Sequence, residues 1–381
     1  MTIQAATLAV GTEVTDGQII DRNSAWISAK LVRAGVQVVE HRAVADDRED
    51  IRRALRELSA RVDHLFVTGG LGPTSDDFTR DLLSEVYGRP LEFDPASWKH
   101  IEDRLRERGI QAKEIQKQQC YFPRGARILL NTAGTANAFS FDGEVVGAGD
   151  KVKVYALPGP PAEIAAVWEK NLASEIEALT PENEREELMI FRCLGRGESD
   201  IAELTEEAIR GSGLRVGYRA HLPYVEVKLW VRDRARAKST LDRVQTALST
   251  WIVNRDEQDA TDALIEKLRA GSPVLIQDSA TGGVLQERIL LRLREKKLAE
   301  GQIPLTIQTS WSKPPSTEAL DSVDFLQIKT DEAQAKWLVS WRNSQNSGTL
   351  EVSPTFNYKL ATERARRYIT EKALLLFGSQ S

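Results

Sequence analysis

The residues with the clearest chemical potential lie at positions 64–81, HLFVTGGLGPTSDDFTRD. A short apolar run at 65–67 has the composition of a buried strand, and three glycines follow at 69–72. Glycines allow a backbone to approach a ligand closely, and the unpaired N–H groups at a helix start attract anions such as phosphate. The paired carboxylates Asp76 and Asp77 are hard oxygen ligands that suit Mg²⁺ or Mn²⁺. The stretch therefore predicts a phosphate and metal site at the carboxyl end of a strand.

A purely structural explanation of this stretch stays open. If a helix begins near Ser75, Asp76 and Asp77 lie in its first turn, where acidic residues stabilise the helix dipole by roughly 0.3–1 kcal/mol each. The glycines can also form a simple tight turn. The pattern is not a Walker A loop, because no lysine follows the glycines, and it is not a GxGxxG motif.

The elements that must position these groups follow from the periodicity of apolar residues. In the first 70 residues it predicts strands at 7–10, 36–44 and 64–68, a helix at 24–34, and a second helix that follows Asp46 and Asp47 and runs through 51–58. Ser24 is the expected N-cap of the first helix. A strand–helix–strand–helix–strand order predicts a parallel sheet with right-handed crossovers.

Acidic residues follow each of these three strands. Glu13 comes after the first strand, the pair Asp46 and Asp47 after the second, and Asp76 with Asp77 after the third. The carboxyl ends of parallel strands share one edge of the sheet, so we expect these side chains to converge. This convergence favours the phosphate and metal interpretation over separate helix caps.

The rest of the chain divides at two polar segments, 180–187 and 256–262, which we interpret as linkers. The part before them contains a helix at 94–109 and an amide-rich stretch at 113–119, for which a solvated helix face is favoured over a ligand contact. Further elements are predicted as strands at 127–131, 138–141 and 155–157, a β-α-β-β-α module at 188–253, and a final unit from 263 to about 378 that closes with a helix at 360–376.

Composition bounds the function. The chain has 381 residues, 41% hydrophobic and 28% charged, with a net charge of −5. This composition is typical of a globular protein of two or three domains and argues against a dedicated nucleic-acid binder. Cys120 and Cys193 have no metal-like spacing, so reduced, buried thiols in a cytoplasmic protein are expected. No signal peptide or membrane span is predicted.

Six stretches together resemble the CinA (competence/damage-inducible protein A) family, in that family's order. They are GTEVTDGQIIDRNSAWISAKL, VADDREDIRRAL, TGGLGPTSDDFTRD, AGTANAF, LPGPPAE and GRGESDIAE. The resemblance implies an α/β fold: a three-layer, parallel-sheet domain at 1–172 like the molybdopterin-binding MoaB and MogA proteins, a small α+β KH-type domain at 186–255, and a C-terminal α/β amidohydrolase-like domain at 260–381. It also implies a homodimer and metal-dependent hydrolysis of ADP-ribose to AMP and ribose 5-phosphate, with Mg, Mn or Co as the divalent metal.

The resemblance also assigns roles to individual residues. Asp46, Asp76 and Asp77 would hold the metal or activate water, with Glu13 as a further metal ligand. The implied substrate-binding residues are Asn23, Gly69, Gly70, Gly72, Thr74, Thr79, Gly134, Thr135, Pro158, Gly159 and Glu163. Which carboxylate is the base and which metal is preferred are left open.

The sequence departs from the family pattern in three places. The LPNPxGTAPGF stretch of the family reads LLNTAGTANAF, with Thr132 and Asn137 at the usual prolines, and NRKQA reads QKQQC at 116–120. The C-terminal domain is similar to the nicotinamide-mononucleotide amidohydrolase of the family. The AESCTGG stretch of that family reads QDSATGG here and keeps Ser279, Thr281, Gly282 and Gly283. However, TSWSK at 309–313 poorly matches YSNxxK, and IKTDEAQ at 328–334 stands where TGIAGP is expected. A vestigial, inactive domain is therefore expected.

Three hypotheses remain from the sequence. The first is a metal-dependent nucleotide pyrophosphatase, which is favoured because carboxylates rather than Lys or Arg surround the glycine loop. The second is a module that binds a pterin or nucleotide without turnover, since fold does not fix function. The third is a scaffold with a decayed site, against which the intact Asp pair counts.

Overall fold

The computed structural model describes residues 2–181, 185–255, 259–298, 303–309, 323–331, 335–343, 347–353 and 362–378. The chain forms two compact units, Met1–Glu186 and Glu187–Ser381. The first unit extends beyond the expected boundary at residue 172, because helix α7 (Ala173–Glu177) buries Ile176 in its core. Within the described ranges, no helix is both long and apolar enough to cross a membrane.

A six-stranded sheet of order β2-β1-β3-β8-β7-β6 is the centre of the first unit. Its strands are β2 (Gln37–Val44), β1 (Gln4–Val10), β3 (His64–Thr68), β8 (Lys151–Leu157), β7 (Ala138–Glu144) and β6 (Arg127–Leu129). The first four are parallel, as expected, while β7 and β6 add antiparallel strands at one side. Every residue of β3 is buried, as a strand covered on both faces requires.

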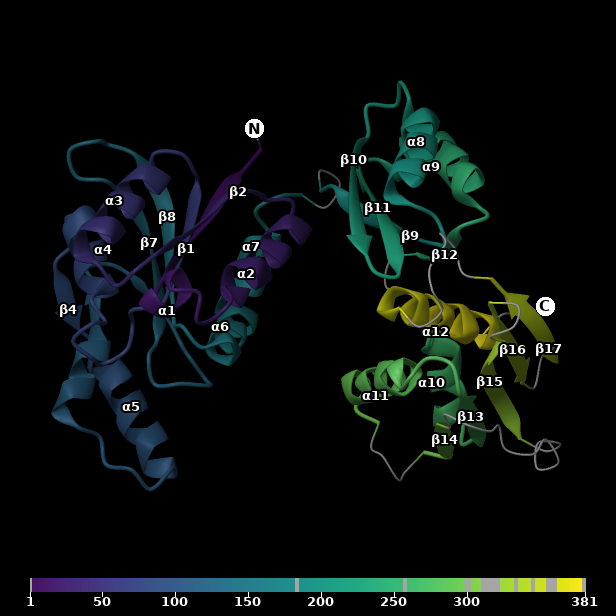
Figure 1. Cartoon of the computed structure of the whole chain (residues 1–381). Helices are drawn as coiled ribbons and strands as arrows, with labels where there is room; N and C mark the ends of the chain where they lie inside the picture. The colour runs from purple at the N-terminus through teal and green to yellow at the C-terminus, as the bar shows by residue number, and fades with distance from the viewer. Residues whose placement is uncertain are drawn as a thin grey trace. The chain divides into compact units, whose positions relative to one another are not determined.

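Helices cover both faces of this sheet and complete three layers (Figure 1). Helices α3 (Arg48–Ser59) and α4 (Thr79–Val86) pack on one face, where Leu8 and Val67 belong to the core. Helices α2 (Arg22–Arg33) and α6 (Pro161–Val167) pack on the other face around Phe66. The remaining elements of the unit are α1 (Thr12–Thr15), β4 (Leu91–Phe93), α5 (Pro95–Glu107), η1 (Glu114–Cys120), β5 (Tyr121–Pro123) and η2 (Trp168–Leu172).

Two predicted helix starts are wrong. Helix α2 begins at Arg22, and its N-cap is Asp21 rather than Ser24, because the Asp21 carboxylate accepts a hydrogen bond from the Ser24 N–H at 2.9 Å. Helix α4 begins at Thr79 rather than near Ser75. The Asp77 N–H donates to the Thr74 carbonyl at 3.0 Å, so these residues close a turn before the helix.

The second unit begins with a four-stranded antiparallel sheet of order β10-β11-β9-β12. Its elements are β9 (Glu187–Leu194), α8 (Glu198–Ile209), β10 (Arg215–His221), β11 (Tyr224–Val231), α9 (Arg234–Leu248) and β12 (Ile252–Arg255). Helix α9 ends before the expected position 253, and the chain returns to the sheet as β12, which the sequence analysis missed. Helices α8 and α9 share one core with β9 and β11.

A five-stranded sheet of order β14-β13-β15-β16-β17 follows in the same unit. Its elements are α10 (Asp262–Arg269), β13 (Val274–Asp278), α11 (Val284–Glu295), β14 (Leu305–Thr309), β15 (Asp324–Asp331), β16 (Lys336–Arg342), β17 (Ser347–Val352) and α12 (Glu363–Gly378). The predicted strand, glycine turn and helix at 273–284 are confirmed, as is the closing helix, whereas the antiparallel β15-β16-β17 meander was not foreseen.

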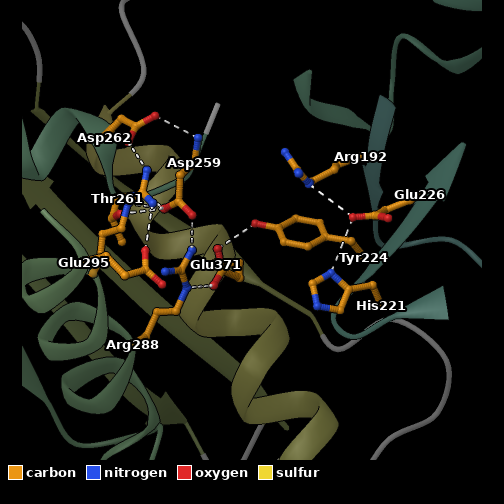
Figure 2. A network of polar contacts seen from close by, with 11 residues as sticks. Arg192, His221, Tyr224, Glu226, Asp259, Thr261, Asp262, Arg288, Glu295 and Glu371 are labelled. Atoms are coloured by element: carbon orange, nitrogen blue, oxygen red, sulfur yellow. Dashed lines mark hydrogen bonds and ion pairs between the residues drawn. The ribbon is translucent and has the colours of Figure 1, made fainter. Parts of the chain in front are cut away.

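A polar network connects strand β11 with helices α11 and α12 of the same unit (Figure 2). The Tyr224 hydroxyl, at the start of β11, donates to Glu371 of α12 at 2.6 Å, and Arg288 Nε of α11 donates to the same carboxylate at 2.6 Å. Arg288 Nη2 also donates to Asp259 at 2.7 Å. Burial and the Glu371 charge raise the pKa of Tyr224 far above its usual range, so its hydroxyl stays a donor.

Replacing Glu371 by leucine tests this network. We expect the free energy of unfolding to fall by about 3 kcal/mol, because the Tyr224 hydroxyl and Arg288 Nε both lose their acceptor and Arg288 keeps only Asp259 as an ion-pair partner. Tyr224→Phe should cost only about 1 kcal/mol, the value of a typical hydrogen bond. Urea denaturation of the full chain, followed by tryptophan fluorescence, measures both. Glu363→Ala is the control, since its pair with Arg367 is exposed and should be worth less than about 1 kcal/mol; equal losses for Glu363→Ala and Glu371→Leu would contradict the network's importance.

Candidate functional site

A pocket of about 920 Å³ opens at the carboxyl ends of β1, β3 and β8. This is the sheet edge at which the acidic residues were expected to converge. Twelve of the residues singled out from the sequence line it: Glu13, Asn23, Asp46, Gly69, Gly70, Gly72, Asp76, Asp77, Thr135, Pro158, Gly159 and Glu163. The structure therefore brings together strand ends that lie up to 150 positions apart in the chain.

Three of the expected substrate-binding residues are not in the lining. Thr79 is fully buried beside Gly70, and the exposed Thr74 holds Asp77. Gly134 packs against the Glu163 carboxylate. These residues can shape the pocket through the residues that they contact.

Two of the carboxylates are oriented by threonines. Asp46 Oδ2 accepts hydrogen bonds from the Thr12 N–H at 2.8 Å and from the Thr12 hydroxyl at 3.0 Å. Asp77 Oδ2 accepts from the Thr74 N–H at 2.9 Å and from the Thr74 hydroxyl. Neither Oδ1 has a hydrogen-bond donor within the part of the chain that is described. Each carboxylate thus holds one oxygen fixed and keeps the other available.

Asp76 is the exposed member of the pair. Hydrogen bonding by the Thr74 side chain lowers the pKa of the Asp76 carboxyl. One hydroxyl proton serves one acceptor at a time, and the contact to Asp77 is reinforced by the Thr74 N–H, so Asp77 is its main partner. Asp76 therefore stays ionised at neutral pH and lacks the rigid anchoring of its neighbour.

Glycines make room for these groups. A Cβ at Gly72 would lie 2.3 Å from Asp77 Oδ2, and a Cβ at Gly134 would lie 2.1 Å from Glu163 Oε2. At Gly69, where φ is +92°, a Cβ would lie 2.2 Å from the backbone carbonyl oxygen of Val10. Gly69 thus allows β3 and β1 to end in direct contact at the bottom of the pocket.

The loop after β3 presents unpaired backbone donors. Among the described residues, the N–H groups of Gly70, Leu71 and Gly72 have no hydrogen-bond acceptor, although all three residues line the pocket. The Gly69 N–H is occupied, because it donates to the Leu157 carbonyl at 3.2 Å, and Pro73 after the loop has no N–H. Successive free N–H groups form a concavity that suits an anion.

The amide-rich stretch at 113–119 proves to hold this loop, so the expectation of a merely solvated helix face is wrong. It forms the 3₁₀-helix η1, from which Gln118 Nε2 donates to the Asp77 carbonyl at 2.9 Å. Gln119 is 3% exposed, lines the pocket, and places Nε2 at 3.5 Å from the Leu71 carbonyl. Amide side chains have no periodic signature, and only the match of Gln119 to the family's NRKQA stretch could have indicated its place.

Arg80 holds the same loop from inside. Its Nη2 donates to the Leu71 carbonyl at 2.8 Å, while Nε and Nη1 are buried without a partner among the described residues. Arg80 is 3% exposed, and this burial lowers the pKa of its guanidinium to about 10. It therefore remains positively charged at neutral pH.

Asn131 is a second organising residue that the sequence analysis missed. Its Nδ2 donates to Glu163 at 2.7 Å, and its Oδ1 accepts from the Gly134 N–H at 2.9 Å. Asn137, one of the departures from the family pattern, accepts from the Asn131 N–H at 2.9 Å. Arg104 binds the Thr132 carbonyl at 2.6 Å, so hydrogen bonds take over the rigidity that prolines would give this loop.

The charge of the pocket is strongly negative. Six carboxylates line it, those of Glu13, Asp21, Asp46, Asp76, Asp77 and Glu163, with Arg22 as the one cation in the lining. Within the described ranges, no group of three or more His, Cys, Asp or Glu side chains is close enough to form a ready ligand set. The donor chemistry still fits Mg²⁺, which is commonly held by one or two carboxylates, with water and substrate phosphate completing its shell.

The second site predicted from the sequence has the form of a helix-capping turn. Asp278 Oδ1 accepts from the N–H groups of Ala280 at 3.0 Å and Thr281 at 2.8 Å, and Thr281 is fully buried. The Ser279 hydroxyl donates to the Ile328 carbonyl at 3.1 Å rather than to a base. Gly282 and Gly283 have positive φ angles of +67° and +94° and lead into α11. The TSWSK stretch from residue 310 and IKTDEAQ from 332 to 334 lie outside the described residues.

Several known proteins are similar to this chain in sequence. Residues 6–178 match a family described as a probable molybdopterin binding domain. A CinA-like protein of Anaeromyxobacter dehalogenans (strain 2CP-C) is 32% identical over 291 residues, which cover 75% of this chain and 70% of that protein. The chain belongs to the CinA-like protein family.

Further relatives extend the comparison. A putative competence-damage inducible protein of Desulforamulus reducens is 28% identical to this CinA-like chain over 294 residues, covering 75% of the chain and 70% of that protein. The crystal structure of a CinA protein of Thermoplasma acidophilum, of unknown function, is 28% identical and covers 46% of this chain and 98% of its own, with a TM-score of 0.40.

Gly69→Ala tests the close approach of β1 and β3. Alanine there must adopt a positive φ, and its Cβ collides with the Val10 carbonyl oxygen. We therefore expect strain and overpacking together to lower the free energy of unfolding by about 3 kcal/mol or more. Gly149→Ala is the matched control, because Gly149 has φ +75° and open space around it, and it should lose only about 1 kcal/mol. Urea denaturation of both variants compares them; similar losses would show that the Val10 contact does not matter.

Proposed function

We propose that the pocket of the first unit hydrolyses ADP-ribose, or a related nucleotide pyrophosphate, to AMP and ribose 5-phosphate with the help of a divalent metal ion. One observation carries the proposal: the loop Gly70–Leu71–Gly72, whose N–H groups have no acceptor among the described residues, and six carboxylates line the same pocket. The loop suits a phosphate, whereas the carboxylates would repel it unless cations lie between them.

The size of the pocket supports this substrate class. Sites for small molecules and cofactors usually enclose about 300–1,000 Å³, and this one measures about 920 Å³. The exposed side chains of Ile19 and Ile20 at its margin add apolar surface. A nucleotide can therefore place its phosphates on the loop and its base or ribose against this margin.

Different residues of the pocket have different proposed roles in the reaction. Asp46 and Asp77, each with one free oxygen, are the proposed metal ligands, and Glu13 lies in the same lining. A bound divalent ion neutralises charge on the pyrophosphate and lowers the pKa of water. The ionised, exposed Asp76 is available to accept a proton from water, while the loop N–H groups orient the phosphate.

A second candidate function is binding of a pterin or nucleotide without turnover. The observation in its favour is that the described carboxylates do not form a set of three ligands. The family that matches residues 6–178 is itself described as a probable molybdopterin binding domain. The test below separates the two functions.

We expect the purified protein to release AMP from ADP-ribose with Mg²⁺, Mn²⁺ or Co²⁺, and to lose this activity in EDTA. Asp77→Ala and Asp46→Ala should reduce kcat by about 100-fold or more, because each removes a group that stabilises charge during the reaction. Asp50→Ala is the control, since Asp50 pairs with Arg53 away from the pocket. A folded protein that binds ADP-ribose but releases no AMP with any of these metals would favour the binding function.

We also propose that the C-terminal part of the second unit, which resembles an amidohydrolase, is inactive, and that the module before it is of the KH type. Ser279 donates to a backbone carbonyl and has no base among its described contacts. A serine needs an adjacent base to act as a nucleophile.

The protein should therefore release no ammonia from nicotinamide mononucleotide. Coupled glutamate dehydrogenase detection measures this directly, with an active amidohydrolase as the positive control. Ammonia release that Ser279→Ala abolishes would contradict the proposed loss of activity.

A further inference from the structure

Arg80 occupies an unfavourable position for an arginine. It is 3% exposed, and among the described residues its guanidinium donates to a backbone carbonyl, while Nε and Nη1 have no hydrogen-bond partner. Burial of a charge without a contact partner is costly. Arg80 also lies in the first turn of α4, where the helix dipole disfavours a cation. An arrangement with these costs calls for a compensating role.

The contact that Arg80 makes points to that role. Its Nη2 donates to the Leu71 carbonyl at 2.8 Å, and Gln119 Nε2 lies 3.5 Å from the same oxygen. In a planar trans peptide the C=O and the following N–H point in opposite directions. Because the Leu71 carbonyl faces the buried guanidinium, the Gly72 N–H faces away from it, and this N–H has no acceptor among the described residues.

We propose that Arg80 is a positioning residue that polarises the Leu71–Gly72 peptide from its buried side. The polarised peptide makes the Gly72 N–H a stronger donor to a phosphate group in the pocket. A cation at the carbonyl end polarises the peptide, and hydrogen bonds in such a chain reinforce one another. Arg80 thus supplies positive charge to an acidic pocket without itself touching the ligand. The inference rests on the proposed function, in which the loop binds the pyrophosphate.

This role also explains why the charge lies behind the loop. A lysine or arginine in the lining would form ion pairs with Asp76, Asp77 or Asp46 and occupy the oxygens proposed for metal. A guanidinium shielded by the Leu71–Gly72 peptide cannot make those pairs, yet its field still reaches the anion. The charge of Asp77 also acts on Arg80, raising the pKa of its guanidinium against the lowering effect of burial.

Binding of α,β-methylene ADP-ribose, which is not hydrolysed, tests the inference by calorimetry with Mg²⁺ present. Arg80→Gln keeps a donor for the Leu71 carbonyl but removes the charge, so its Kd should rise by about tenfold or more, as expected for a charge-assisted hydrogen bond. Arg80→Lys keeps the charge and should stay within about threefold of wild type. Arg42→Met is the control for lost charge, since Arg42 pairs with Glu40 and Glu57 outside the pocket.

A second measurement, by NMR, uses the wild-type protein and so does not require that any Arg80 variant folds. In protein labelled with ¹⁵N-glycine, the Gly72 amide proton should move downfield when the analogue binds. Unchanged affinity in folded Arg80→Gln, equal losses in Arg80→Gln and Arg80→Lys, or no shift at Gly72 would overturn the inference.

If wild type binds the analogue but does not hydrolyse ADP-ribose, the proposed hydrolysis fails while the role of Arg80 is still decided; if wild type does not bind the analogue, both fail.

Discussion

The Leu71 carbonyl points into the protein, away from the pocket, and this orientation determines which backbone groups of the loop after β3 are available to a ligand. Arg80 and Gln119 approach this oxygen from the buried side, and Gln118 holds the Asp77 carbonyl at the end of the same loop. With these carbonyls engaged, the free N–H groups of the loop are left for a ligand. A loop of glycines alone would sample many conformations, so its ability to bind an anion depends on side chains from α4 and η1 that fix the backbone.

Asp46 and Asp77 are held in a similar way: one carboxylate oxygen of each is fixed by hydrogen bonds and the other is free. Thr12 and Thr74 each hold one oxygen of an aspartate, while glycines leave space where side chains would collide with Asp77, Glu163 or the end of β1. The pocket therefore gathers negative charge without gathering a complete set of metal ligands. A site of this kind is completed by what it binds, and this favours a substrate that brings phosphate oxygens with it.

Much of this architecture could be predicted from sequence. Hydrophobic periodicity and the rule that parallel strands end at one edge were enough to bring Glu13, Asp46 and Asp77 to one pocket. The start of α2 was missed because Asp21 rather than Ser24 caps it, and the start of α4 at Thr79 because a turn at 74–77 precedes the helix. Periodicity could not indicate the roles of Gln118, Gln119 and Asn131, because amides that bind a distant backbone show no periodic pattern; only the family's NRKQA stretch pointed to Gln119. Strand β12 and the β15-β16-β17 meander depend on pairing with distant strands, which short windows of sequence do not encode.

The hydrogen bond between Tyr224 and Glu371 joins residues 147 positions apart and lies among the ion pairs of Arg288 (Figure 2). On the ribosome, Tyr224 is made long before its partner. At a synthesis rate of 5–20 residues per second, roughly 7–30 s pass between the synthesis of Tyr224 and that of Glu371 in α12. During that time the sheet of β9–β12 must remain folded on its own core or be protected, and the buried side chains of this junction are open to solvent. The order of synthesis thus makes this junction the last part of the second unit to close.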